Sequence, residues 1–163
     1  MRKCQTTLIT LLLTAPVTLS GAVLEESPWG TLEDGTPATR YTLTNAHGAR
    51  ASFMALGAAI LEVEAPDRQG RLADVVLGFD AAADYGRGNS AYFGLTVGRY
   101  ASRIFGTELV LGDERHTLVA QPGRGGVPGD VVLHGGPDGF SSRVWTASRI
   151  TDADGERIRS SHR

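Results

Sequence analysis

Short apolar runs alternate with turn residues along most of this chain, from about residue 40 onward. The clearest run is residues 59–65, where Leu61, Val63 and Ala65 occupy every second position and two glutamates stand between them. In an extended chain, alternate side chains point to opposite faces. The pattern therefore predicts a half-buried β-strand whose alanine, leucine and valine side faces the core.

The same reading predicts several more strands. They are expected at residues 41–44, 51–56, 73–79, 107–111, 115–119 and 144–150. The run at 73–79 is apolar almost throughout, which favours a more fully buried strand, and 107–119 is predicted to fold as a hairpin about Gly112. Residues 80–85 fit one helical turn capped by Asp80. Since no segment keeps helical periodicity beyond two turns, we expect an all-β fold, an antiparallel β-sandwich or barrel.

The first residues have the composition of a secretory signal peptide. Two basic residues, Arg2 and Lys3, precede the apolar residues 8–13, and small residues follow at 20–22. The apolar stretch is too short to span a bilayer as a helix, although a buried helix is the alternative. We expect residues 1–22 to be removed, leaving one domain over 23–163 that is periplasmic or secreted and has no membrane attachment.

Composition then narrows the chemistry of that domain. The only cysteine is Cys4, so a chain cleaved after Ala22 has no thiol catalysis, disulfide or cysteine-bound zinc. Cleavage also lowers the formal charge from −2 to −4, because Arg2 and Lys3 are lost. A mildly acidic domain without a basic run is poorly suited to nucleic acid. No two of the four histidines have metal-ligand spacing on one element, so no metal site is expected.

One histidine stands at a place suited to binding. His134 ends the apolar run 131–133 and is followed by Gly135 and Gly136. A polar residue at a strand end that opens into glycines lies at the mouth of a sheet, where a ligand can approach the backbone. The imidazole can then donate to or accept from a ligand oxygen. The alternative is that His134 satisfies carbonyl groups of its own loop.

Arg103 is a second candidate, in the segment 98–104. Its planar guanidinium suits vicinal hydroxyls or a carboxylate, although a surface ion pair is the commoner use of an arginine. Tyr92, Phe93 and Phe140 flank the two segments and could pack against the C–H face of a sugar or simply fill the core. The glycine-rich residues 121–129 lack a following helix, which favours a plain loop over a phosphate cradle.

Taken in order, these segments resemble the N-terminal half of the aldose 1-epimerases, or galactose mutarotases. The resemblance rests on residues 41–45, 72–80, 92–94, 97–104, 133–137 and 139–145. It implies a large antiparallel β-sandwich of the galactose mutarotase type. It also implies that the substrate is a hexose such as glucose or galactose, whose α and β anomers are interconverted by acid–base ring opening and reclosure. No cofactor is implied.

The resemblance also assigns roles to residues. The family's sugar-holding arginine and histidine match Arg103 and His134, and Ser102 stands where the family has asparagine. The family's general-acid histidine and general-base glutamate match no residue here, so we expect them beyond Arg163 and this chain to be a truncated copy. A non-catalytic sugar-binding module and an inactive remnant are the alternatives. Unpaired strand edges in such a partial sandwich would favour self-association.

Overall fold

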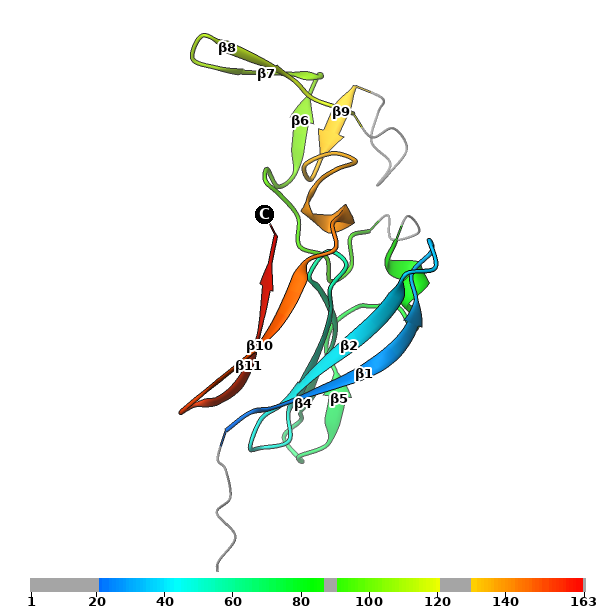
Figure 1. Cartoon of the computed structure of the whole chain (residues 1–163), viewed down its shortest axis with the longest axis vertical. Coiled ribbons are helices and arrows are strands. Elements are labelled where there is room, and N and C mark those ends of the chain that lie inside the picture. Colours follow the sequence, from blue (N-terminus) through cyan, green and yellow to red (C-terminus); the bar gives the residue numbers. More distant parts are fainter. Residues whose placement is uncertain (1–20, 87–90, 121–129, 163) are drawn as a thin grey trace, which may run out of the picture.

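The largest element of the computed structural model is an antiparallel sheet (Figure 1). The structure describes residues 21–86, 91–120 and 130–162. Five strands pair in chain order, so each is hydrogen-bonded to the next along the sequence. They are β1 (Val23–Thr31), β2 (Pro37–Thr44), β3 (Arg50–Met54), β4 (Ala59–Pro66) and β5 (Leu72–Asp74).

Three two-stranded pieces follow the sheet in the chain. Strand β6 (Arg103–Phe105) pairs with β9 (Val131–Leu133), and the hairpin β7 (Glu108–Leu111) and β8 (Glu114–Thr117) extends from them. The last pair is β10 (Thr146–Asp152) with β11 (Gly155–Ser161). In the described residues the helical elements are two short 3₁₀ turns, η1 (Ala82–Tyr85) and η3 (Phe140–Ser142). All strand pairs are antiparallel, which confirms the predicted all-β class.

The main core lies between the sheet and η1. At the start of β4 the predicted alternation is confirmed, because Leu61 is 4% exposed and its neighbour Ile60 is 39% exposed. Further along the strand it is not, because Val63 and Ala65 are half-buried, like the glutamates beside them. Tyr85 of η1 is fully buried, and its hydroxyl accepts a hydrogen bond from the backbone N–H of Phe79. The buried residues of this cluster are Ala38, Met54, Leu56, Ala59, Leu61, Ala82, Tyr85 and Leu95. Burial of this apolar surface is the main stabilising contribution to the sheet.

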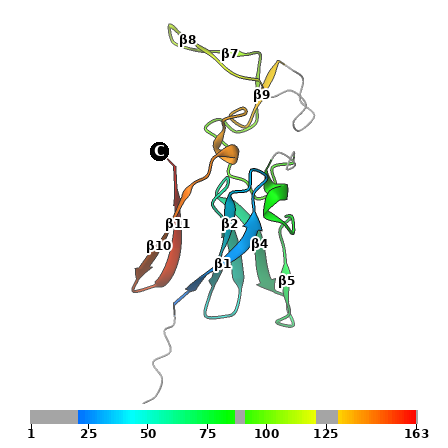
Figure 2. The ribbon, with the colours of Figure 1, turned by 45° about the vertical axis from the view of Figure 1, so that its right-hand side comes forward.

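The hairpin β10–β11 lies beside the sheet and is joined to it near the start of β1 (Figure 2). The backbone N–H of Leu24 donates to the carboxylate of Glu156 at 2.6 Å. Arg149 forms ion pairs with Glu26 at 3.2 Å and with Glu156 at 2.6 Å. Ion pairs and a charge-assisted hydrogen bond thus connect the last hairpin to the first strand.

Two local predictions are wrong. Residues 73–79 were expected to form a buried strand, but β5 ends at Asp74, and Val75 and Leu77 are 63% and 71% exposed. The Asp74 carboxylate accepts hydrogen bonds from the N–H groups of Val63 and Val76, which ends the ladder at the sheet edge. Asp80 was expected to cap the next turn, but the capping position of η1 is Ala81, and no side chain caps it.

Other predictions are confirmed or lie outside the described residues. The hairpin of 107–119 forms about Gly112, and the strand expected at 144–150 begins two residues later, at Thr146. The body of the predicted signal peptide, residues 1–20, and the loop 121–129 lie outside the described residues. Within the described part of the chain, no helix has the length and apolar character needed to cross a membrane.

Candidate functional site

The pairing of β6 with β9 brings the two predicted segments together. Arg103 lies opposite Leu133, so Ser102 and His134 face each other just beyond the ends of the strands. The backbone N–H of His134 donates to the carbonyl of Ser102 at 2.9 Å. The N–H of Ser102 donates in turn to Nδ1 of the His134 ring at 3.0 Å. All three predicted site residues therefore meet at one place.

The backbone at this place is held in an unusual conformation. In the described part of the chain, four non-glycine residues have positive φ. Three of them belong to this cluster: Tyr92 at 59°, Ser102 at 74° and His134 at 52°. Non-glycine residues in the left-handed region carry strain that the surrounding structure must offset, and such residues concentrate at binding and catalytic sites. This strain is an indication of function that no sequence pattern displayed.

Tyr92 anchors the cluster to the rest of the molecule. Its ring meets the His134 ring edge to face, with centroids 4.7 Å apart and an interplanar angle of 67°. Tyr92 packs against the main core cluster and also against the smaller cluster of Val131 and Leu133. Sequence reasoning named Tyr92, but only as one of three flanking aromatic residues. The other two lie elsewhere, since Phe93 contacts Phe79 and Phe140 contacts Trp145.

The His134 ring is neutral near pH 7. Burial lowers the pKa of His134, and the nearby positive charge of Arg103 lowers this pKa further. The Nδ1 atom of His134 accepts a backbone N–H from the facing loop, so the contact observed for this nitrogen is with a backbone donor and not with a carbonyl. Within the described residues Arg103 makes no ion pair, so its alternative role as a partner in a surface pair is not observed either.

Glycines allow the loops around the cluster to pack closely. The carbonyl of Gly98 accepts a hydrogen bond from the N–H of Phe140 at 3.1 Å. A Cβ atom on Gly135 would lie 1.9 Å from this carbonyl oxygen, and one on Gly139 would lie 2.7 Å from the carbonyl oxygen of His134. Only glycine fits these two positions. The glycines are visible in the sequence, but the close approaches to carbonyl oxygens that require them could not be predicted from it.

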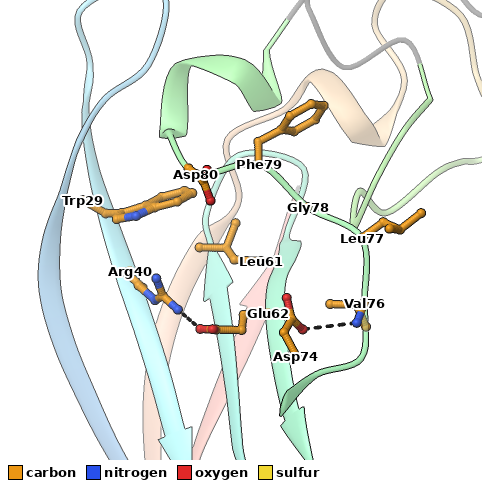
Figure 3. Close-up of a pocket in the computed structure, with 10 residues that line it drawn as sticks. All are labelled: Trp29, Arg40, Leu61, Glu62, Asp74, Val76, Leu77, Gly78, Phe79 and Asp80. Carbon is orange, nitrogen blue, oxygen red and sulfur yellow. Dashed lines mark hydrogen bonds and ion pairs between the residues drawn. The ribbon is translucent and has the colours of Figure 1, made fainter.

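Neither of the two hollows identified in the described residues is lined by Arg103 or His134. One, of about 340 Å³, lies on the sheet below η1 and is shown in Figure 3. Arg40 pairs there with Glu62 and lies over the Trp29 ring at 5.9 Å, so these charges are used within the fold. The other, of about 410 Å³, has a mostly apolar lining that includes Tyr92. The cluster itself is an exposed surface where two loops meet.

No metal site was found among the residues that the structure describes, where no three histidine, cysteine, aspartate or glutamate side chains gather. The side chains of the cluster itself offer hydrogen-bond donors and acceptors and one fixed positive charge, that of Arg103. A guanidinium and a neutral imidazole side by side can donate to several oxygens of a hydroxylated ligand.

Comparisons with known proteins agree on one family. The sequence model of the family described as "Aldose 1-epimerase" matches residues 39–162. A "Probable aldose 1-epimerase" of Arthroderma benhamiae is 35% identical over 121 residues, which is 72% of this chain and 26% of that protein. The "Aldose 1-epimerase" of Escherichia coli K12 is 32% identical over 123 residues, 76% of this chain and 33% of that protein. The chain thus spans between a quarter and a third of the length of these relatives.

Solved structures show the same relationship. A GalM/aldose epimerase homologue from C. elegans superposes with a TM-score of 0.54 at 28% identity, covering 80% of this chain and 33% of that one. The galactose 1-epimerase of Lactobacillus acidophilus NCFM superposes with a TM-score of 0.59 at 25% identity, covering 80% and 36%. Together with the strand content, this confirms the all-β sandwich fold.

Proposed function

Because the chain belongs to the aldose 1-epimerase family, we propose that the cluster of Ser102, Arg103 and His134 binds a hexose for interconversion of its α and β anomers. The observation that carries the proposal is the convergence of these residues across the β6–β9 pair. The Arg103 guanidinium offers a rigid set of N–H donors that matches neighbouring hydroxyls. The neutral ring of His134 adds a directional hydrogen bond, and the Ser102 hydroxyl adds a donor and acceptor of shorter reach than asparagine.

The role proposed for these residues is binding and orientation. Anomer exchange requires a base on the anomeric hydroxyl and an acid on the ring oxygen, so that the ring opens and recloses on the other face. The positive charge of Arg103 favours the partial negative charge that gathers on sugar oxygens as the ring opens. Holding the pyranose in one orientation brings both oxygens to fixed positions for proton transfer. The proton-transferring histidine and glutamate expected from the family are not among the residues matched here.

Two measurements on the chain test the proposal. Titration calorimetry with glucose and galactose is expected to show heat of binding, and Arg103→Met is expected to abolish it. Arg115→Met is the matched control, because Arg115 lies on the outlying hairpin and pairs with Glu108. Equal binding by both variants would overturn the assignment of Arg103. A folded wild-type chain that binds neither sugar would overturn the proposed site.

Polarimetry of freshly dissolved α-D-glucose then separates catalysis from binding. A rate above that of buffer, lost in Arg103→Met, supports an active epimerase. Binding without a rate above buffer supports the alternative of a non-catalytic sugar-binding module. Absence of both supports an inactive remnant. These outcomes are distinguishable in a single preparation, provided that circular dichroism shows the β-rich fold.

We also propose that the chain is exported, with cleavage after Ala22. Such cleavage leaves β1 whole, because this strand begins at Val23. It removes the bridge between Ala22 and Gly155, and the contacts of Leu24 and Glu26 with the last hairpin remain. Mass spectrometry of the chain from a periplasmic extract is expected to give a mature N-terminus at Val23. An uncleaved chain confined to the cytoplasm would overturn this proposal.

A further inference from the structure

The ring of His134 is tied to the backbone at one nitrogen and open at the other. Nδ1 accepts the N–H of Ser102 at 3.0 Å. Within the described residues, Nε2 has no hydrogen-bond partner. A neutral imidazole carries one proton, and the nitrogen that accepts a hydrogen bond cannot hold it. The proton therefore belongs on Nε2, which makes His134 a hydrogen-bond donor toward its open side.

This arrangement depends on the rotation of the ring about its Cβ–Cγ bond. That rotation is broad for histidine, because the bond joins an sp³ carbon to an sp² carbon. Besides the hydrogen bond from Ser102, a ring contact restricts it: the Tyr92 ring stands at 67° to the imidazole, with centroids 4.7 Å apart. Tyr92 itself packs against both apolar clusters, so the position of its ring is fixed.

We propose that Tyr92 is a positioning residue: its ring holds the His134 imidazole with Nδ1 on the Ser102 N–H, and so presents Nε2–H as a donor to a ligand oxygen. The ligand in this statement is the hexose of the proposed function, on which this part of the inference rests. The tautomer itself does not depend on any ligand. A donor at this point suits a sugar oxygen that directs a lone pair toward it, whether the ring oxygen or a hydroxyl.

The backbone around the two rings supports the same interpretation. Tyr92, Ser102 and His134 all have positive φ, so the chain accepts strain at the three residues that make these contacts. Burial and the charge of Arg103 keep the pKa of His134 low, so the ring stays neutral at pH 7 and has a single N–H to place.

The direct test is a long-range ¹H–¹⁵N correlation spectrum of the uniformly labelled chain at pH 7, which distinguishes the two neutral tautomers. The His134 signals are identified by their loss in His134→Gln. We expect the pattern of a protonated Nε2 and an accepting Nδ1. A protonated Nδ1, or an even mixture of tautomers, would overturn the proposal without any reference to sugar binding.

The variant Tyr92→Met tests the positioning role, because methionine is flexible and fills the same apolar space without a rigid face. We expect it to give mixed tautomers, whereas Tyr92→Phe keeps the ring and the wild-type pattern. Should Tyr92→Met fail to fold, Tyr92→Leu serves in its place. A pure Nε2–H pattern in a folded methionine or leucine variant would overturn the role of Tyr92.

Hexose binding gives a second readout. Loss of one well-placed donor is expected to weaken binding by about threefold to tenfold in Tyr92→Met, and Tyr92→Phe is expected to retain wild-type affinity. If the wild-type chain binds no hexose but shows the Nε2–H pattern, the proposed function fails and the positioning role stands. Equal affinity in wild type and Tyr92→Met, with binding intact, would refute the proposed use of the donor.

Discussion

Replacing Gly135 by alanine tests the loop packing that supports the candidate site. Gly135 has a φ of 91°, a conformation that costs an L-residue about 1–2 kcal/mol. A Cβ there would also lie 1.9 Å from the carbonyl oxygen of Gly98, and real Cβ contacts are essentially never below 3.0 Å. The oxygen must therefore move by about 1 Å.

That movement breaks a second interaction. The same oxygen accepts the N–H of Phe140 at 3.1 Å, and the loss of such a bond costs about 1 kcal/mol. Strain and the lost bond together predict that Gly135→Ala lowers the free energy of unfolding by about 3 kcal/mol. Gly48→Ala is the matched control, because Gly48 has a φ of 83° with no atom within 4 Å of the added Cβ. Gly48→Ala introduces the backbone strain without the lost hydrogen bond, so it is expected to cost about 2 kcal/mol.

Urea denaturation followed by tryptophan fluorescence measures the difference, since Trp145 packs on Phe140 at 5.3 Å between centroids. With an m-value of about 2 kcal/mol per molar, the midpoint falls by about 1 M in Gly48→Ala and about 1.5 M in Gly135→Ala. Hexose binding should weaken only in Gly135→Ala, whose loop carries His134. Equal midpoints for the two variants would refute the steric argument and leave backbone strain as the whole effect.

Three further predictions concern other parts of the molecule. Ser102→Asn should raise the urea midpoint, because asparagine tolerates the φ of 74° better than serine; an unchanged or lower midpoint would contradict this. Leu77→Lys should reduce any concentration-dependent association seen by light scattering, because Leu77 is a 71% exposed apolar residue near the edge strand β5; association equal to wild type would place the contact elsewhere. The pKa of Glu156 is lowered by its hydrogen bond from the Leu24 N–H and then by Arg149. Its folded pKa lies below the unfolded one, so its stabilisation is present above the unfolded value and lost as pH falls through the folded value. Glu156→Gln should therefore flatten the acid limb of a stability–pH profile, and an unaltered limb would refute the linkage.

The sequence predicted those parts of the fold that depend on side-chain alternation. At the start of β4 the pattern was strong enough to assign the buried face, and Leu61 and Ile60 have the exposures expected. The prediction of a buried strand at residues 73–79 was wrong, because an apolar run can be buried on both faces or lie at the edge of a sheet. The run itself does not distinguish the two positions. The edge position of β5 is set by the order of strands in the sheet, which is a tertiary property.

Only part of the candidate site could be predicted from the sequence. His134 could be placed at a strand end, because an apolar run precedes it and glycines follow it. Its partner could not be found, since the hydrogen bond to Nδ1 comes from a backbone N–H, and every residue except proline has one. The pairing of Ser102 with His134 needs the register of β6 against β9, two strands separated in the chain by residues 106–130.

This dependence on the backbone bears on position 102, where the resemblance to the family leads us to expect asparagine and the chain has serine. Both hydrogen bonds between residue 102 and His134 use main-chain atoms of residue 102, so neither depends on its side chain. The substitution therefore leaves the placement of the imidazole intact. What it changes is the strain at a positive φ and the reach of one side chain toward a ligand. Position 102 should then influence stability and sugar affinity while leaving the tautomer of His134 unaltered. A shift in that tautomer in Ser102→Asn would show that the side chain, and not the backbone, controls the ring.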